Sequence, residues 1–536
     1  MPFRALAAAV AAVAVAPAGA AAAPAPPPPP GTPAVTFLVS GHGWGHGLGM
    51  SQWGARGYAL HGWTYDRILA HYYQGTTLGP APVSKVRVLL ADGATSLKLG
   101  STGAWTVVDG SGQTHDLEPG TLALGPALRI TASGAADPAA LPGPLSFASK
   151  GTPLRLGKTS YRGSIQVTKT KGGKLQAVDV VGLEDYLRGV VPAEMPSTWP
   201  PEALKAQAVA ARSYALAQRA TGKPYDLFAD VRSQVYGGVG AESAAASAAI
   251  DATRGIVVLS GGEVADTLFF SSSGGRTASY AEAFSGGPLS YLVSVDDPYD
   301  ESPYVNWGPV AVDGAKAAKA LGVHGPVEGI DTVTGPSGRV VTATLTLPAG
   351  TKQVTGGELR TKLGLRSTWL EPIGLLELRT AAAKLTVGGR TMLSGLVRGA
   401  GTDAPQLEQR AAGAAWTTAA APKLAADGSF SLRVRPAATT QYRLVAGTLR
   451  GSVAKLPVAP AVRLDTGLRG TVRPAVLDRQ VQVQVQTGPR WLTVATVPVD
   501  AAGAFSAGAL GPGTYRARYA PGGGLAPGLS APLVVQ

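Results

Sequence analysis

Residues 190–216 read VVPAEMPSTWPPEALKAQAVAARSYAL and place one carboxylate, Glu194, between Pro192 and Pro196. Each proline fixes its own φ and disfavours helix for the residue before it, which predicts a stiff, non-helical segment around Glu194. From Ala203 to Arg219 the residues are mostly Ala, Leu, Gln and Arg, which favour helix. Small side chains on every face are typical of a buried helix. The stretch therefore predicts a rigid loop that carries an acid, followed by a central helix.

The start of that helix has its own signals. Ser197 or Thr198 is expected near the N-cap, with Pro201 in the first turn. Glu202 follows at a position favoured by the helix dipole, so we interpret it as structural.

The flanking sequence predicts an α+β core with a β-rich subdomain. Residues 83–175 alternate apolar and polar side chains over short runs separated by Gly and Asp turns, which indicates strands. Residues 176–300 mix strands with the helix after Glu202 and a second helix near Ala241–Thr253.

After about residue 378 an internal repeat becomes visible. Trp416 precedes Phe430 and then Tyr442, and Trp491 precedes Phe505 and then Tyr515, with the same spacing from tryptophan to phenylalanine in both copies. Spaced aromatic residues with Gly-rich turns predict two immunoglobulin-like β-sandwich modules, at 380–458 and 459–536. The aromatic residues are expected in the module cores, with carbohydrate binding by the tryptophans as the less favoured alternative.

Composition and the first residues predict an exported protein. Residues 1–23 have the charged, apolar and small-residue regions of a signal peptide, and the proline-rich 24–34 predicts a linker. No later segment has the apolar length of a membrane span, so a secreted, wall-associated protein is expected. There is no cysteine, which excludes disulfides and cysteine-based zinc sites. The net charge of +13 suits anionic wall polymers. Nucleic acid is not expected, because basic residues are scattered singly.

Three further motifs accompany the Glu194 stretch. They are GHGWGHGLGMSQWGARG within Gly41–Thr77, SQVYGG at Ser233–Gly238 and SSSGGRT at Ser271–Thr277. Together the four motifs resemble the sporulation stage II protein D and amidase-enhancer family (SpoIID/LytB), over roughly residues 35–375. The Gly41–Thr77 block usually closes this domain in the family, whereas here it opens it, so the order looks circularly permuted.

The resemblance implies a lytic transglycosylase that cleaves peptidoglycan glycan strands, with Glu194 as general acid and base. It also implies a substrate groove formed by residues around that acid. We predict substrate contacts from Gln207, Arg212, Tyr214, His46, Ser51, Gln52, Gln234, Tyr236, Ser271, Ser272 and Ser273. The residues alone leave two alternatives open: Glu194 caps the next helix or pairs with Arg188 or Arg212, and Arg212 forms an ordinary buried ion pair.

Other chemistries fit the residues less well. A glycoside hydrolase would need a second carboxylate from Glu184, Asp185 or Asp297. Glu184 and Asp185 are better explained as favourable charges at a helix start. His42 and His46 lack a third metal ligand, and Phe270 stands where some relatives place a histidine, so neither a metal nor a cofactor is expected. The serine run has no nearby base for nucleophilic catalysis. A non-catalytic wall-binding protein that enhances an amidase remains the main functional alternative.

Overall fold

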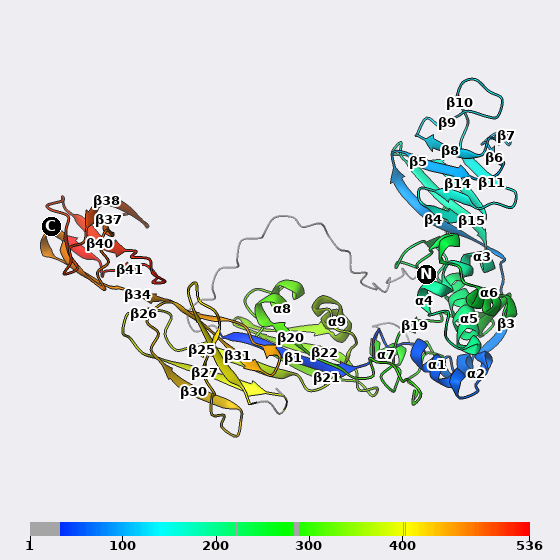
Figure 1. Cartoon of the computed structure of the whole chain (residues 1–536). Helices are drawn as coiled ribbons and strands as arrows, with labels where there is room; N and C mark the ends of the chain where they lie inside the picture. The colour runs from blue at the N-terminus through cyan, green and yellow to red at the C-terminus, as the bar shows by residue number, and fades with distance from the viewer. Residues whose placement is uncertain (1–32, 221, 284–288, 400, 402–403) are drawn as a thin grey trace.

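The computed structural model describes residues 33–220, 222–283, 289–399, 401 and 404–536. The expected signal peptide and almost all of the expected linker lie outside the described residues. The described chain is dominated by β-strands, with most of its helices gathered in one unit (Figure 1). Within these residues no helix is long and apolar enough to cross a membrane.

The central helix is α5, Pro201–Ala217, and it is buried on nearly all sides. One face packs Ala208, Ala211 and Ala215 into a core shared with α3 (Leu183–Arg188) and α6 (Ala244–Ala252). Another face packs Ala206, Val209 and Ala210 against α1 (Gln52–Leu60) and α2 (Tyr65–Tyr72). Small alanines allow helices to approach from both sides, as the composition of this segment predicts.

The helix start differs in detail from the prediction. Pro200 occupies the N-cap and no side chain caps the helix, so neither Ser197 nor Thr198 has the expected role. Pro201 does lie in the first turn. Glu202 accepts hydrogen bonds from the Tyr65 N–H at 2.8 Å and from Lys205 Nζ at 2.6 Å, which agrees with a structural role.

A β-rich subdomain leads into this helical core. Its seven-stranded sheet has the order β16-β4-β15-β14-β11-β6-β7, and a four-stranded sheet β13-β12-β5-β8 packs with it around a common apolar core. The strands are β4 Lys85–Ala94, β5 Leu97–Ser101, β6 Trp105–Val108, β7 Thr114–Leu117, β8 Gly120–Leu124, β11 Leu145–Ser149, β12 Leu154–Leu156, β13 Thr159–Tyr161, β14 Ser164–Lys169, β15 Leu175–Gly182 and β16 Leu227–Phe228.

Strand β1, Ala34–His42, lies inside a sheet whose other strands come from much later in the chain. It pairs antiparallel with β20 (Trp307–Asp313) on one side and with β25 (Gly374–Thr380) on the other. In Figure 1 the blue β1 lies among green and yellow strands. Both faces of β1 are buried: Ala34 and Leu38 belong to one core, and Val35, Phe37 and Val39 belong to another.

The second of these cores is closed by a small α/β layer. A three-stranded sheet, β21-β22-β23, packs with α8 and α9 around Phe37 and Trp307. The bounds are β21 Gly329–Thr334, β22 Val340–Leu347, β23 Gly350–Thr355, α8 Gly314–Leu321 and α9 Gly356–Leu363.

The sheet that contains β1 continues across the boundary expected near residue 378. Its order is β20-β1-β25-β27-β30, where β27 is Thr391–Arg398 and β30 is Ser429–Val434. The core on that side joins Leu376 and Leu378 to Leu393 and Phe430. The strands assigned to the first repeat are therefore structurally continuous with those before it.

The C-terminal part of the chain, from Ala461 onward, has a core of its own. One sheet has the order β35-β36-β39 and a second has the order β38-β37-β40-β41, and their apolar side chains meet in one cluster. The strands are β35 Ala461–Asp465, β36 Arg469–Arg473, β37 Gln480–Thr487, β38 Arg490–Pro498, β39 Ala504–Ser506, β40 Gly513–Tyr519, β41 Gly528–Leu529 and β42 Leu533–Val535.

The aromatic residues of the two repeats divide into two groups. Phe430, Tyr442, Phe505 and Tyr515 are core residues as expected. Trp416 and Trp491 are not: each is half-buried on a sheet surface, where an arginine stacks on its ring.

Candidate functional site

Glu194 is the last residue of a single helical turn, α4, Val191–Glu194. The prediction of a non-helical segment was wrong, because Pro192 stands in the first turn of α4, where a helix needs no N–H donor and tolerates proline. Met195 is extended and precedes Pro196, so the turn ends directly after the acid. The two prolines hold Glu194 between a short helix and the start of α5.

Burial raises the pKa of the Glu194 carboxyl above the ordinary glutamate value. Arg188 and Arg212, the two partners considered for it, pair with Asp251 and Glu184 instead. The Glu194 charge also raises the pKa values of two tyrosines, Tyr186 and Tyr214. Burial is the larger cause in both cases, and the pKa of Tyr214 rises to about 12. Glu194 is thus a half-buried acid with tyrosines nearby and a pKa shifted toward neutrality.

The N-terminal block reaches Glu194 through Gln52. Gln52 Nε2 donates to the main-chain oxygen of Glu194 at 2.9 Å and to Gln207 Oε1 at 3.4 Å. Gln207 is fully buried on α5, and among the described residues its Nε2 has no partner. Gln52 therefore supports the backbone of the acid directly, and Gln207 contacts Gln52 from α5.

Two aromatic rings and an arginine extend from this point, and none of the three was among the predicted site residues. Trp53 and Trp199 contact edge to face at 4.8 Å, and the Arg56 guanidinium lies 5.3 Å and 5.8 Å from their ring centroids. Arg56 follows Gln52 by one turn of α1, so both lie on the same helix face. The spacing Q-x-x-x-R was the available signal, but it has meaning only once α1 is known to pack along residues 194–199.

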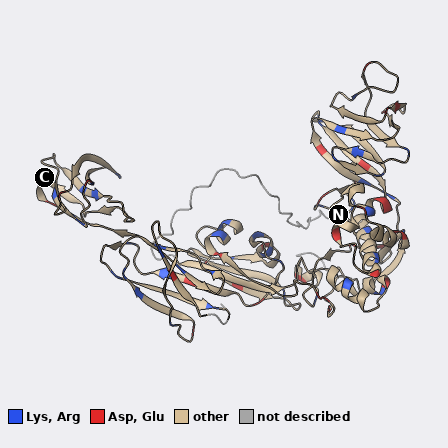
Figure 2. Cartoon of the chain, in the orientation of Figure 1, with Lys and Arg blue, Asp and Glu red and all other residues tan. Residues whose placement is uncertain are grey.

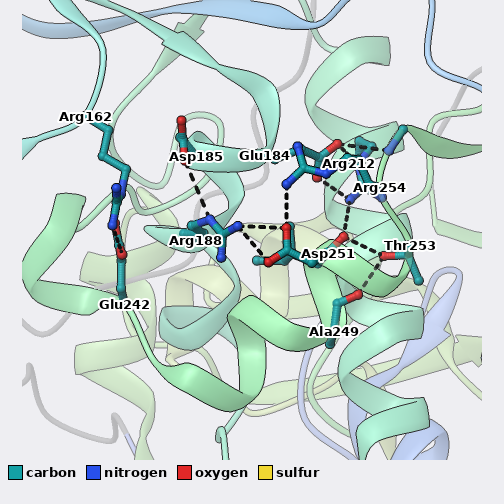
Figure 3. Close-up of polar contacts among 12 residues, drawn as sticks. Arg162, Glu184, Asp185, Arg188, Arg212, Glu242, Ala249, Asp251, Thr253 and Arg254 are labelled. Atoms are coloured by element: carbon teal, nitrogen blue, oxygen red, sulfur yellow. Dashed lines mark hydrogen bonds and ion pairs between the residues drawn. The ribbon is translucent and has the colours of Figure 1, made fainter. Parts of the chain in front are cut away.

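Arg212 lies inside the helical core, in an ion pair with Glu184. Its guanidinium donates to the Glu184 carboxylate at 3.1 and 2.6 Å and to the Ile256 carbonyl at 2.9 Å (Figure 3). The Arg212 side chain has no exposed surface. These contacts match the buried ion pair that the sequence left as the alternative to substrate binding. Nearby, Arg188 pairs with Asp185 at 3.5 Å and with Asp251 at 2.7 Å.

Gln234 and Tyr236 are also interior residues. Gln234 Oε1 accepts a hydrogen bond from the Tyr186 hydroxyl at 3.2 Å, and the Tyr236 hydroxyl donates to Asp179 at 3.0 Å. Burial raises the pKa of Asp179 to about 8. Gln234 therefore contacts Tyr186, whose pKa the Glu194 charge helps to raise. Tyr236 belongs to the apolar core.

The two block histidines have separate partners. His46 Nδ1 accepts from the Leu48 N–H at 3.1 Å, so its Nε2 carries the proton and donates to the Phe269 carbonyl at 3.0 Å. Burial lowers the pKa of His46 to about 4, which keeps the ring neutral. His42 contacts Glu371 and the Val305 carbonyl. The contact between this block and Glu194 is therefore made by Gln52, while His46 hydrogen-bonds the strand that ends at Phe270.

The serine run surrounds a buried aspartate. Asp300 Oδ2 accepts from the Ser272 hydroxyl at 2.9 Å, the Ser273 hydroxyl at 3.0 Å and the Ser273 N–H at 2.6 Å. Ser51 caps α1 and also points at Asp300, at 3.4 Å, and Ser271 accepts from the Trp53 N–H through its carbonyl. Ser272 and Ser273 have almost no exposed surface. The run therefore anchors the N-terminal block.

Asp297, the third candidate for a second carboxylate, is fully buried beside the same cluster. Its Oδ1 accepts from the Tyr72 hydroxyl at 2.8 Å, and burial followed by the Asp300 charge raises its pKa to about 7. Gly54 lies against it, since a Cβ there would stand 2.3 Å from the carboxylate. The block glycine thus permits a close approach.

Known proteins match the part of the chain that contains this site. Residues 171–259 match the family model described as SpoIID, Stage II sporulation protein. That range holds α3, α4 with Glu194, α5 and α6. Residues 171–259 are thus similar to the SpoIID family. The SpoIID match does not extend to the N-terminal block, which the structure nevertheless packs against it.

Individual relatives agree with the SpoIID assignment. The Stage II sporulation protein D of Bacillus subtilis is 30% identical over 230 residues, which is 39% of this chain and 64% of that protein. The amidase enhancer of Bacillus subtilis is 39% identical over 121 residues, 23% of this chain and 16% of that protein. An uncharacterized protein of Brachyspira hyodysenteriae is 40% identical over 121 residues, which is 22% of this chain and 33% of that protein. The chain thus spans less than two thirds of the length of each of these relatives.

Proposed function

We propose that this chain is a cell-wall lytic transglycosylase that cleaves peptidoglycan glycan strands, with Glu194 as its general acid and base. The observation that carries the proposal is the state of Glu194: a half-buried carboxyl, with its pKa raised by burial and its main chain held by Gln52. An acid that must protonate a glycosidic oxygen near neutral pH needs such a raised pKa.

One acid is enough if the attacking group belongs to the substrate. The 6-hydroxyl of the muramic acid unit is held close to the anomeric carbon within the same sugar, so no second carboxylate is required to position water. Glu194 first protonates the departing glycosidic oxygen. As a carboxylate it then removes the 6-hydroxyl proton while the 1,6-anhydro ring closes. Each proton transfer contributes about 10²–10⁴-fold in rate.

The surroundings of Glu194 support a groove for sugars. Trp53 follows Gln52, which holds the Glu194 backbone, and its ring contacts that of Trp199. Tyr214 is a partly exposed hydroxyl donor whose pKa the Glu194 charge helps to raise. Such an arrangement of aromatic faces and a few polar groups suits carbohydrate binding. The two-carboxylate hydrolase is less favoured, because Glu184, Asp185 and Asp297 are engaged with Arg212, Arg188 and Tyr72.

Relatives named for sporulation and for amidase enhancement support a cell-wall-related role and a secreted or wall-associated location. The relative named amidase enhancer also favours the second candidate, a non-catalytic partner of a wall amidase. Both candidates place the chain on peptidoglycan. They differ in whether the chain itself breaks a bond.

Product analysis with the Glu194→Gln variant separates the two. The wild-type chain is incubated with purified peptidoglycan freed of other enzymes, and the soluble products are analysed by mass spectrometry. We expect 1,6-anhydro-muramic acid ends from wild type and at least a hundredfold less from Glu194→Gln. Reducing muramic acid ends would indicate hydrolysis instead. If wild type releases no product but stimulates an added amidase, and Glu194→Gln does so equally, the amidase-enhancer alternative holds.

A further inference from the structure

The final module has a polar face on the sheet β38-β37-β40-β41, opposite the face that packs in its core. In β37 the valines Val481 and Val483 point into the core, so the intervening glutamines stand on the opposite face. In β40 Tyr515 and Ala517 are core residues, which places Arg516 and Arg518 on that same opposite face. Gln482 pairs with Arg518 and Gln484 with Arg516 across the two strands.

The side chains on this face form an ordered array. Arg516 Nε donates to Gln484 Oε1 at 2.8 Å, and Arg518 Nη1 donates to Gln482 Oε1 at 2.9 Å. The Arg516 guanidinium lies 4.3 Å from the centre of the Trp491 ring, which is on the neighbouring strand β38. The strands β37, β38, β40, β41 and β42 contain neither Asp nor Glu. The face is therefore cationic, rich in amides, and bordered by an aromatic ring.

The preceding repeat has a related arrangement, with the difference that Arg443 is paired with the Glu408 carboxylate at 2.6 Å. Trp416 lies under the Arg443 and Arg410 guanidinium groups, at 4.1 and 4.7 Å, and Arg410 donates to Gln441 at 2.6 Å. Arg443 and Arg516 each follow the core tyrosine of their own repeat. Neither tryptophan belongs to an apolar core, so core packing does not account for a tryptophan at this place in both repeats.

We propose that these two faces, Trp416 with Arg443 and Trp491 with Arg516, bind the glycan strands of peptidoglycan. An indole ring packs against the C–H face of a sugar, and glutamine amides donate to and accept from acetamido groups. Arginines pair with carboxylates, which are free on muramic acid where the peptide stem has been removed and on the peptide stems themselves. A ligand made of repeating sugars also suits a protein with two similar sites, since binding at one site raises the effective concentration at the other. This inference does not depend on catalysis by Glu194.

The test uses the full chain with Glu194→Gln in every sample, so that no glycan is consumed. Binding is measured by co-sedimentation with insoluble peptidoglycan from which phosphate-containing polymers have been stripped, and with untreated walls. The variants are Trp491→Ala, Arg516→Gln and the double change Trp416→Ala with Trp491→Ala. The matched control is Arg463→Gln, which removes one exposed arginine from the other sheet of the same module, where it pairs with Asp465.

We expect Trp491→Ala and Arg516→Gln each to lower the association constant for stripped peptidoglycan about fivefold. The double variant should lose more than either, because two sites act together. Arg463→Gln should bind like its parent, and thermal unfolding should confirm that all variants are folded. Equal losses in Arg463→Gln would show that only net charge matters. Undiminished binding by the double variant would overturn the proposal, and so would binding restricted to untreated walls, which would assign the face to phosphate polymers.

Discussion

The side-chain amide of Gln52 donates a 2.9 Å hydrogen bond to the main-chain oxygen of Glu194, which lies 142 positions further along the chain. This bond fixes the end of α4 relative to α1. It acts on the backbone and not on the carboxyl, so Gln52 is a positioning residue.

Replacing Gln52 with Met should therefore impair catalysis more than folding. Methionine has a similar volume but cannot donate, so we expect kcat on glycan strands to fall about tenfold or more as Glu194 loses its fixed position. The free energy of unfolding should fall by only about 1 kcal/mol. The pH–rate profile is the deciding measurement. If Gln52 positions Glu194, its loss changes the environment of the acid, so the apparent pKa values of the profile should shift. The control is Gln176→Met, which loses a bond to Asp92 in the β-rich subdomain. Equal effects of the two changes would contradict the prediction.

Glu194 should make the folded protein less stable at neutral pH than a neutral residue would. Its folded pKa is raised by burial, so the folded state holds the proton more tightly than the unfolded state. Stability therefore falls as the pH rises from the unfolded pKa of about 4.3 through the folded value. Glu194→Gln lacks this dependence, and we expect it to unfold at higher urea concentration than wild type at pH 7.5 but at the same concentration near pH 4. A constant difference at both pH values would disagree with the raised pKa.

Asp297 should produce a second pH dependence of stability. Its folded pKa is about 7, against about 3.9 in the unfolded chain, so its contribution to stability declines between about pH 4 and pH 7. Asp297→Asn keeps an oxygen for the Tyr72 hydroxyl and removes the charge. Relative to wild type, the free energy of unfolding of this variant should therefore be higher at pH 8 than at pH 5. Curves that stay parallel would mean that Asp297 is not protonated on folding.

Arg212 should contribute strongly to stability, since its removal leaves the mostly buried Glu184 carboxylate without its arginine partner. We expect Arg212→Met to lower the free energy of unfolding by about 3–5 kcal/mol. Arg162→Met, which breaks the half-exposed pair with Glu242, should cost no more than about 1 kcal/mol. Urea unfolding followed by circular dichroism measures both. A stable Arg212→Met variant with weakened glycan binding would instead restore the predicted substrate contact.

A chain that ends at residue 458 should fold, whereas a chain that ends at residue 378 should not. A chain that ends at 458 keeps β27 and β30, and the final module takes its own core with it. A chain that ends at 378 exposes Leu38, Leu376 and Leu378, which pack against Leu393 and Phe430. We expect the longer form to resist limited proteolysis and the shorter form to be degraded or insoluble. A well-folded shorter form would show that the shared sheet is dispensable.

Local sequence signals predicted the elements around the site well. The alanine-rich α5, the second helix α6 and the alternating strands of residues 83–175 follow from periodicity and propensity. The error at Glu194 has a clear cause: Pro192 is equally compatible with a loop and with the first turn of a helix, and only packing decides between them.

The interior roles of the site residues depend on partners that are distant in sequence, and local patterns do not identify such partners. Arg212 and Tyr236 look like polar groove residues until Glu184 and Asp179 are placed beside them. Ser272 looks accessible until Asp300 is placed next to it. Charge patterning gave no indication either, since Lys and Arg are dispersed over the described part of the chain (Figure 2).

The position of β1 has a consequence for biogenesis. A ribosome makes Ala34–His42 long before β20, which begins at Trp307, and β25, which begins at Gly374. At about 5–20 residues per second, this apolar strand waits tens of seconds or more for both neighbours. During that interval its unpaired edges and two apolar faces are open to wrong pairing. A holding chaperone, or delivery across a membrane while unfolded, would keep the strand available until its neighbours have been synthesised.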